Sequence, residues 1–225
     1  MLKKEKTKET FCVFKVSYCI FAKNFIKMKE NILYKATDMF LTYGFKSVTM
    51  DDIANKMGIS KKTIYTHYKT KTELVKDSSL QLFEFISSGI DCICEEEKNP
   101  IEELYEIKKF VMLHLKDEKS SPQYQLQKYY PKIYQMLKTK QFEVMHSCVK
   151  ENLKRGVEMG EYLKKINTEF VARIYFSGII SIKDDELFPI ELFPKDKLLE
   201  NYLEYHLRGI CTEKGLKTLE NFILK

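Results

Sequence analysis

The chain has 225 residues, of which only 8 are Gly and 5 are Pro. These two residue types make up about 6% of the chain against an average of about 12%, which is too few for the many turns of a sandwich or barrel. A hydrophobic content of 44% can form a core, which excludes an intrinsically disordered chain. The apolar stretches are all shorter than the ~20 residues that span a bilayer. We therefore expect a soluble, helix-rich protein with no membrane partner.

The net charge of +6 is distributed unevenly along the chain. Residues 1–27 hold seven Lys and two acidic residues, and residues 28–76 hold nine Lys and five acidic residues, whereas residues 77–225 have a small acidic excess. A polyanionic partner such as nucleic acid would therefore bind the N-terminal third. All three Arg residues lie outside that third.

The six cysteines form no C-x-x-C pair, and no His stands beside Cys92 or Cys94 in the sequence. This pattern favours reduced thiols that fill core space in a cytoplasmic protein. The sequence also lacks the motifs of phosphate-binding loops, serine hydrolases and zinc peptidases, and its four His residues are not at metal-ligand spacing. We expect no catalytic residue, no metal site and no cofactor.

Residues 1–27 combine several Lys with an apolar stretch, as a signal peptide does. Lys15 interrupts the stretch, however, and no small-residue cleavage site follows Ala22. Three interpretations stay open: an upstream mis-start or loosely attached extension, a basic arm that contacts DNA, and a working signal peptide. The first is favoured, because Met28 stands directly before the first well-patterned helix.

The first helix pattern runs from Leu33 to Tyr43, and Gly44 follows as a C-cap. A second helix is predicted to begin after Thr49. Thr49 and Asp52 have the spacing of a capping box, in which two backbone donors at the helix start are satisfied.

The second helix is predicted to end at Gly58, and Ser60 is placed to cap a third helix. In that third helix, Ile64 and Tyr68 lie four residues apart and are expected to face inward. The opposite face carries cations and hydrogen-bonding groups, namely Lys61, Lys62, Thr63, Thr66 and His67. Two short helices joined by a Gly-centred turn are typical of a helix-turn-helix that reads the major groove. The alternative is that this charged face of the third helix is exposed to solvent and binds no DNA.

The run from Phe40 to Leu74 resembles the DNA-binding domain of the TetR (tetracycline-repressor) family. Its most specific segment is Val48-Thr49-Met50-Asp51-Asp52-Ile53-Ala54, followed by Met57-Gly58-Ile59-Ser60 and by Thr63-Ile64-Tyr65-Thr66-His67-Tyr68. The resemblance covers residues 30–76, and it implies an all-α homodimer whose three-helix DNA-binding head over 28–76 precedes a helical domain over 77–225. The second domain would bind an effector and dimerise. The implied function is transcriptional repression at a double-stranded DNA operator, relieved by a small molecule; the alternative is an architectural DNA-binding factor without an effector.

By the same resemblance, Thr49 and Lys71 hold phosphates at the starts of the second and fourth helices. The recognition-helix contact positions are Ser60, Lys61, Thr63, Tyr65 and His67, to which the outward face adds Lys62 and Thr66. Lys62 departs from the family pattern, which usually has Gly there. Because the head has no Arg, the common Arg–guanine contact is unavailable, although Lys also reaches guanine.

Beyond residue 100 the sequence predicts further helices, with breaks near residues 120–122, Pro131, Gly160 and 184–194. Gly156 and Gly160 form a G-x-x-x-G on a helix too charged for a membrane, which indicates close packing or helix termination. An aromatic-rich stretch is the candidate effector pocket, with ordinary core as the alternative for each residue. Its predicted lining is Phe110, His114, Tyr124, Tyr130, Tyr134, Phe142 and His146.

Residues 170–180 are apolar almost all round, and a second apolar face lies between Leu199 and Ile210. By the resemblance these two segments pack against the same segments of a second subunit. The predicted interface residues are Val171, Ile174, Tyr175, Gly178, Leu199, Tyr202, Leu203 and His206. The alternative is that both segments form the core of their own chain.

Overall fold

The computed structural model describes residues 27–114, 122–184, 186–189 and 191–223. Residues 1–26, on which the interpretations of the N-terminal extension depend, lie outside these ranges. Within them the regular structure is helical, and the β-type pairing is a single isolated bridge between Tyr162 and Cys211. The predicted all-α class is confirmed. None of the helices within these ranges combines the length and the apolar character needed to cross a membrane.

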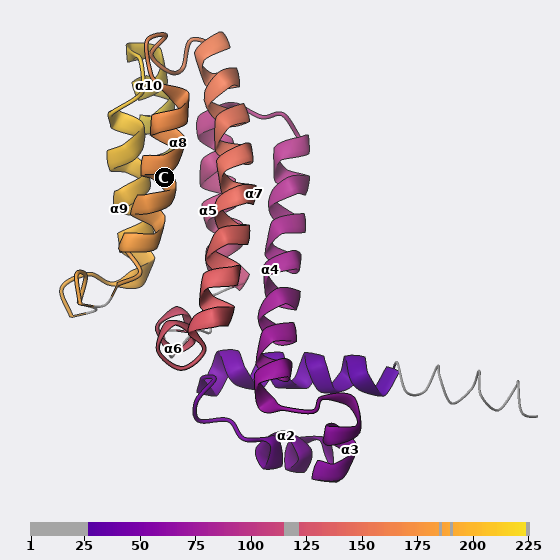
Figure 1. Ribbon diagram of the computed structural model, residues 1–225. Coiled ribbons are helices and arrows are strands. Elements are labelled where there is room, and N and C mark those ends of the chain that lie inside the picture. The colour runs from indigo at the N-terminus through magenta and orange to yellow at the C-terminus, as the bar shows by residue number, and fades with distance from the viewer. Residues whose placement is uncertain (1–26, 115–121, 185, 190, 224–225) are drawn as a thin grey trace, which may run out of the picture. The chain divides into compact units, whose positions relative to one another are not determined.

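The chain divides into two compact units, Met1–Ser79 and Leu80–Lys225. The N-terminal unit contains a helix over residues 27–43, then α2 (Met50–Met57), α3 (Lys61–His67) and the first part of α4 (Lys71–Glu95). The C-terminal unit contains the rest of α4 and then α5 (Pro100–His114), α6 (Pro122–Tyr129), α7 (Pro131–Glu158), α8 (Thr168–Ser181), α9 (Lys195–Arg208) and α10 (Glu213–Ile223) (Figure 1). The division falls inside α4, so this helix contributes to both units.

The N-terminal unit is built around a small core to which every helix contributes. Ile32 and Phe40 of the first helix, Ile53 of α2 and Ile64 of α3 are fully buried. Tyr68 directly after α3 is also fully buried, so the predicted inward face of α3 is confirmed.

The predicted apolar stripe of the first helix is wrong at its last position, because Tyr43 is 61% exposed. Gly44 follows with φ of 89°, a left-handed conformation that turns the chain back on itself. Phe45 then packs on Phe40 with ring centroids 5.3 Å apart. The ring of Phe45 therefore fills the core beside Phe40, and Tyr43 is left at the surface.

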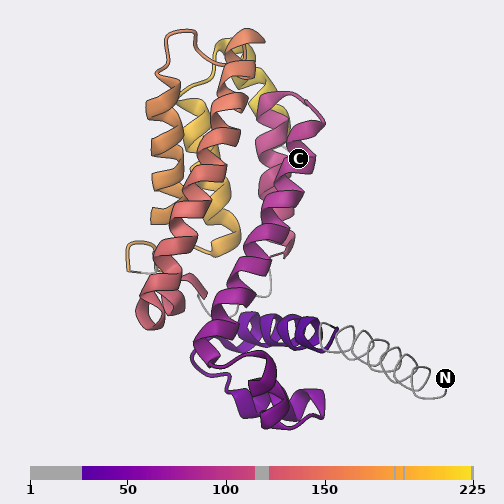
Figure 2. The ribbon, with the colours of Figure 1, turned by 45° about the vertical axis from the view of Figure 1, so that its right-hand side comes forward.

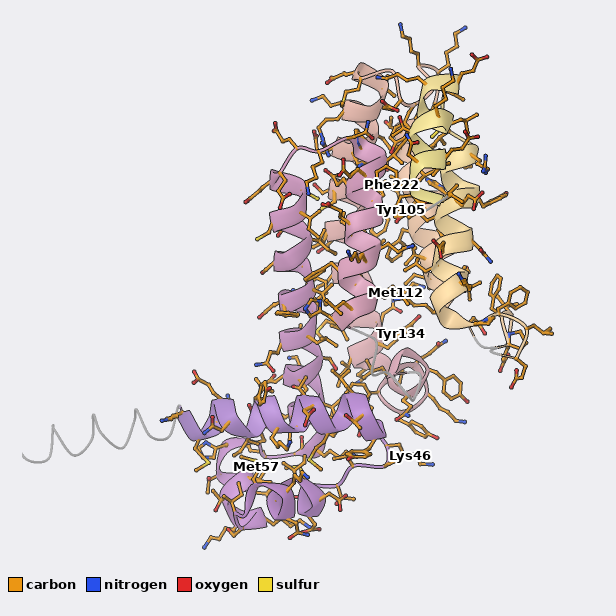
Figure 3. All side chains as sticks on the ribbon, turned by 180° about the vertical axis from the view of Figure 1, so that it is seen from behind. Lys46, Met57, Tyr105, Met112, Tyr134 and Phe222 are labelled. Carbon is orange, nitrogen blue, oxygen red and sulfur yellow. The ribbon has the colours of Figure 1, made fainter. Side chains whose placement is uncertain are left out.

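The core of the C-terminal unit lies among α5, α7, α8, α9 and α10, and Figure 2 shows α7, α8 and α9 side by side. Leu153 of α7, Leu203 of α9 and Leu219 of α10 are almost fully buried within it. Tyr105 of α5 stacks on Phe222 of α10 with ring centroids 5.4 Å apart (Figure 3). The sequence pattern did not separate α10, which closes one side of this core.

The two glycines of the G-x-x-x-G segment have different roles. Gly156 lies inside α7 against the ring of Tyr162, where a methyl group would overlap the ring. Gly160 follows the helix with φ of 73°, so it ends α7 in the left-handed conformation. Close packing explains the first glycine and helix termination explains the second.

A buried polar network joins α5 to α7. Asn152 donates from Nδ2 to Glu103 Oε1 at 2.8 Å and to the carbonyl of Pro100 at 2.9 Å. Tyr162 donates its hydroxyl to Asn152 Oδ1 at 3.1 Å, and the guanidinium of Arg155 pairs with Glu103. Glu103 is only 1% exposed, so this pairing compensates the cost of burying its charge.

The burial of His206 predicts a pH-dependent stability for the C-terminal unit. It is 9% exposed and lies 4.9 Å from the ring of Tyr175, and burial lowers its pKa to about 4 from an ordinary value of 6.5. Between these values the unfolded chain binds a proton that the folded chain does not. The free energy of unfolding should therefore fall as pH falls from about 6.5 to about 4, by at most about 3 kcal/mol from this residue.

Denaturant unfolding of the natural chain and of His206→Phe, measured from about pH 7 to about pH 4, checks this expectation. Phe keeps an aromatic ring at the site but cannot be protonated. The variant should lose less stability across the window, and an identical pH dependence in the two proteins would contradict the assignment to His206.

Candidate nucleic-acid interface

A tight turn joins α2 to α3. Gly58 has φ of 66°, and its N–H donates to the carbonyls of Ala54 and Asn55 at the end of α2. Two residues later Ser60 caps α3, because its hydroxyl accepts a hydrogen bond from the backbone N–H of Thr63 at 3.0 Å. The predicted helix-turn-helix is therefore present, and its turn is held by hydrogen bonds at both ends.

The start of α2 has the capping box that the sequence predicts. Thr49 Oγ1 accepts from the backbone N–H of Asp52 at 3.1 Å, and Asp52 Oδ2 accepts from the backbone N–H of Thr49 at 2.8 Å. The Thr49 hydroxyl also donates to Asp52 Oδ2 at 2.7 Å, and these hydrogen bonds hold the pKa of Asp52 below its ordinary value. Both donors of Thr49 are thus used within the cap, and a phosphate would have to displace Asp52 to receive one.

The two neighbouring lysines at the start of α3 have different environments. Lys61 Nζ lies 2.6 Å from Asp51 Oδ2, and this ion pair between α3 and α2 raises the pKa of Lys61. Lys62 is exposed, and it has no ion-pair or hydrogen-bond partner in the part of the chain that the structure describes. Of this pair, Lys62 is the cation that is available to a ligand.

The remaining side chains of the outer face offer hydrogen bonds rather than charge. Tyr65 is 43% exposed, and Thr66 is exposed with its hydroxyl donating to the carbonyl of Thr63 at 2.6 Å. Burial, together with the nearby Lys29, lowers the pKa of His67. The imidazole is therefore neutral at pH 7 and can donate or accept a hydrogen bond there.

Lys71 lies at the start of α4 and is partly enclosed. Its Nζ donates to the carbonyl of Lys46 at 3.2 Å and lies 6.0 Å from the ring centroid of Phe40. Burial lowers its pKa, and the charge of Asp52 opposes that shift. The ammonium group therefore already connects α4 to the segment that precedes α2.

The cap of α4 departs slightly from the capping-box pattern. Thr70 accepts a hydrogen bond from the backbone N–H of Glu73 at 3.1 Å, as the first residue of a capping box does. The carboxylate of Glu73, however, accepts from the backbone N–H of Lys69 at 2.9 Å, one residue before the cap. This contact holds the short connection between α3 and α4.

The residues predicted to line one effector pocket separate into two aromatic clusters. Phe110 and His114 of α5 have ring centroids 4.4 Å apart and lie beside Phe85 of α4. Phe142 and His146 of α7 have ring centroids 5.2 Å apart and face α8 instead. The prediction failed to separate these groups because spacing along a helix does not show which neighbouring helix each face meets.

The three tyrosines of the predicted pocket lie around α6 and the start of α7. Tyr124 is 48% exposed, and Lys128 donates to its hydroxyl at 3.0 Å. Tyr130 is the N-cap residue of α7, and Tyr134 is half-buried in the first turns of that helix (Figure 3). These side chains belong to neither aromatic cluster.

Most of the residues predicted for a subunit interface pack inside their own chain. The buried ones are Val171, Tyr175, Leu203 and His206. Gly178 receives the ring of Tyr202, whose hydroxyl donates to the carbonyl of Tyr175 at 2.9 Å, and Leu199 is half-buried. These seven residues therefore pack as the alternative interpretation expects, in the core of their own chain.

The exposed apolar side chains of α8 and α9 are largely ones that the sequence did not single out. Phe170 is 61% exposed and Tyr205 is 78% exposed. Among the predicted interface residues, Ile174 is the one that is exposed, at 48%. Phe170 and Ile174 are four residues apart and so share one face of α8. Because α8 is apolar almost all round, its sequence does not show which apolar residues face the core and which face solvent.

A family model described as "Bacterial regulatory proteins, tetR family" matches residues 32–77, which contain α2, α3 and the turn between them. This segment of the chain is therefore similar to the DNA-binding domain of the TetR family. It is 28% identical over 76 residues to the HTH-type transcriptional repressor KstR2 of Mycolicibacterium smegmatis, covering 34% of this chain and 37% of that protein. It is 28% identical over 79 residues to the biofilm operon regulator IcaR of Staphylococcus aureus, covering 35% of this chain and 42% of that protein. The match thus spans about two fifths of each curated relative's length.

Solved structures of transcriptional regulators, one of them described as a member of the TetR family, share the fold over most of the chain. One from Agrobacterium tumefaciens has a TM-score of 0.67 at 16% identity, covering 84% of this chain and 100% of that chain. A transcriptional regulator from Saccharomonospora viridis, in complex with choline, has a TM-score of 0.70 at 16% identity, covering 83% and 99%. The family model is described as one of regulatory proteins, and both curated relatives are named as transcriptional regulators.

The capping box of α2 makes a testable contribution to stability. Thr49→Ala removes the acceptor for Asp52 N–H and should lower the free energy of unfolding by about 1 kcal/mol. Thr49→Ser keeps the hydroxyl and should retain most of that stability. Chemical denaturation of the three proteins checks this, and equal losses for Ala and Ser would show that the hydroxyl is not the stabilising group.

Proposed function

We propose that this TetR-family protein is a homodimeric, sequence-specific DNA-binding transcriptional regulator, a repressor that a small molecule releases from its operator. The observation that carries the proposal is the outer face of α3, where Lys62, Tyr65 and Thr66 are exposed beside a hydrogen-bonded turn. The family match over residues 32–77 includes this face. The names of the curated relatives, a transcriptional repressor and a negative transcriptional regulator, support repression as the sign of control.

In the proposed complex α3 lies in the major groove with Lys62 toward the base edges. A lysine in this position can donate to O6 and N7 of guanine, and threonine and tyrosine hydroxyls add contacts to bases or phosphates. Ser60, which caps this helix, and Thr63 and His67 within it are proposed to add further contacts. Lys61 and Lys71 are proposed as phosphate contacts, since an exposed ion pair such as Lys61–Asp51 is weak enough to exchange for phosphate.

The homodimer is proposed to form through α8 and α9. Phe170 and Ile174 expose one apolar face of α8, and the Tyr202 hydroxyl donates to the carbonyl of Ile174 at 3.1 Å, so α9 lies next to this face. An exposed apolar face of this kind is typical of a subunit contact. A two-fold symmetric pair would present two copies of α3 to two half-sites of one operator.

The effector is proposed to bind the C-terminal unit. The cluster at Phe110 and His114 and the cluster at Phe142 and His146 are the two candidate sites, because each combines aromatic surface with an imidazole. His146 Nε2 lies 3.0 Å from Glu169, which gives the second cluster a charged neighbour. The choline complex of the Saccharomonospora regulator supports a small molecule as the class of effector.

Replacing Lys62 by Ala should change which sequence the protein prefers. Each lost base contact is expected to weaken operator binding by about 1–3 kcal/mol, with a smaller effect on random DNA. The operator would first be selected from fragments of the source genome, and affinities for operator and random DNA would then be measured by fluorescence anisotropy at one salt concentration.

The matched control is Lys61→Ala, which removes the same charge from the neighbouring position. As a phosphate contact Lys61 should affect operator and random DNA to the same extent. If Lys62→Ala also weakens both DNAs equally, Lys62 is a phosphate contact and does not select the operator. If the natural chain binds neither operator nor random DNA, the proposed function itself is wrong.

Introducing a charge at Ile174 should dissociate the proposed dimer without unfolding the chain. Ile174 is 48% exposed, so a Glu side chain is solvated in the single chain but buried without a partner in the dimer. Sedimentation across a concentration series should show a weakened dimer, with circular dichroism confirming unchanged helix content. The control is Leu113→Glu on α5, where an apolar side chain of 66% exposure is replaced. Unchanged dimers in the Ile174→Glu protein would contradict the interface.

A further inference from the structure

The start of the first helix lies beside the end of α3. Lys29 Nζ lies 5.2 Å from the ring centroid of Tyr68, the residue that follows α3, and the Tyr68 hydroxyl donates to the backbone carbonyl of Lys29 at 3.5 Å. Figure 1 shows α3 below the N-terminal half of the first helix, which is drawn in indigo. We propose that Lys29 binds a DNA phosphate at this end of α3, a contact that rests on the proposed function.

The buried face of the first helix sets the direction of the Lys29 side chain. Ile32 and Ala36 are fully buried, and they follow Lys29 by three and seven residues, so all three residues lie on one face of this helix. Lys29 is half-buried and extends the inward face by one turn, to the margin of the core. A lysine in such a place covers apolar surface with its methylene groups and keeps its charge at the boundary with water. The ammonium group is therefore directed toward α3 and not away from the head.

The charge of Lys29 is not compensated by a carboxylate. Lys29 has no ion pair with any residue that the structure describes, and its ammonium group lies instead over the ring of Tyr68. Lys61, by contrast, is paired with Asp51. The charge of Lys29 also reaches His67, because it adds to the effect of burial in lowering the pKa of this imidazole. A phosphate would therefore meet a positive charge beside His67 without first breaking an ion pair.

A position at the end of α3 fits the backbone of DNA. Because α3 has seven residues, its two ends are about 10 Å apart, close to the major groove's width of about 12 Å. In helix-turn-helix proteins the N-terminal residues of the second helix contact the base edges. With Lys62 at the base edges, the opposite end of α3 lies near the border of the groove, where the phosphates are. Lys29 would thus fix the position of the helix without reading the sequence.

A purely structural role for Lys29 is the alternative that the test must separate. A cation near the C-terminal end of a helix stabilises that helix by interacting with its dipole and its free carbonyl groups. A lysine with this role alone would change the free energy of unfolding but not the salt dependence of DNA affinity. A phosphate contact changes the salt dependence, because each neutralised phosphate releases counterions from the DNA.

The test compares the full natural chain with Lys29→Met, which removes the charge but keeps an unbranched apolar side chain beside Tyr68. Affinities for the selected operator and for random DNA are measured by fluorescence anisotropy between about 50 and 200 mM salt. We expect Lys29→Met to weaken binding to both DNAs by the same factor. It should also flatten the plot of log affinity against log salt by about 0.9 for each bound subunit. Lys29→Arg keeps the charge and should retain the natural slope.

The matched control is Lys35→Met on the same helix. Lys35 Nζ pairs with Asp38 Oδ2 at 2.8 Å, and six residues place Lys35 on a different face from Lys29, so this variant should keep the natural slope. Thermal unfolding verifies that each variant folds, and Lys29→Gln gives the same comparison if Lys29→Met does not fold.

The possible outcomes distinguish this contact from the proposed function. A natural salt slope in the uncharged Lys29 variant overturns the contact, even if that variant is less stable, and leaves the role of α3 in DNA binding intact. Weakened binding to the operator alone also overturns it, because a phosphate contact carries no sequence information. If the natural chain binds no DNA, the contact and the proposed function are both wrong.

Discussion

The surface proposed to read DNA depends on the backbone conformation of Gly58. At φ of 66° the chain leaves α2 and enters α3 within three residues, and this sets the direction in which the outer face of α3 points. A side chain at Gly58 would meet no atom within 4 Å, so the requirement for glycine comes from the left-handed backbone and not from crowding. That conformation costs other L-residues about 1–2 kcal/mol. The caps at Thr49 and Ser60 complete the constraint, because they fix where each helix begins.

Within this frame, pairing decides which positive charges are available to DNA. Lys61 is held by Asp51 and Lys71 by the carbonyl of Lys46, while Lys62 has no such partner within the described ranges. These contacts hold the side chains of Lys61 and Lys71 in place in the absence of DNA. Contacts of this kind at the surface are weak enough to be exchanged for contacts to phosphate. Lys62, where the family usually has Gly, therefore combines a long reach with an uncommitted charge. For this reason Lys62 is the residue that we propose selects the operator sequence.

The C-terminal unit is organised around buried polar contacts as well as an apolar core. Glu103 is almost fully buried, and Asn152 and Arg155 of α7 satisfy its two carboxylate oxygens. Removing one partner would leave a buried charge uncompensated, which is more costly than losing an ordinary surface pair. The same arginine fastens the connection between α4 and α5 to α7.

The sequence by itself determined the local features of the DNA-binding head. The caps at Thr49 and Ser60, the turn at Gly58 and the inward face of α3 all depend on residues three to four positions apart, and such relations can be read from spacing alone. Spacing also showed that α8 is apolar, but only the tertiary structure decided that Tyr175 faces the core and Phe170 faces solvent. The separation of the two aromatic clusters was decided in the same way. A periodic pattern defines a face of a helix, whereas what covers that face depends on how helices distant in the sequence pack.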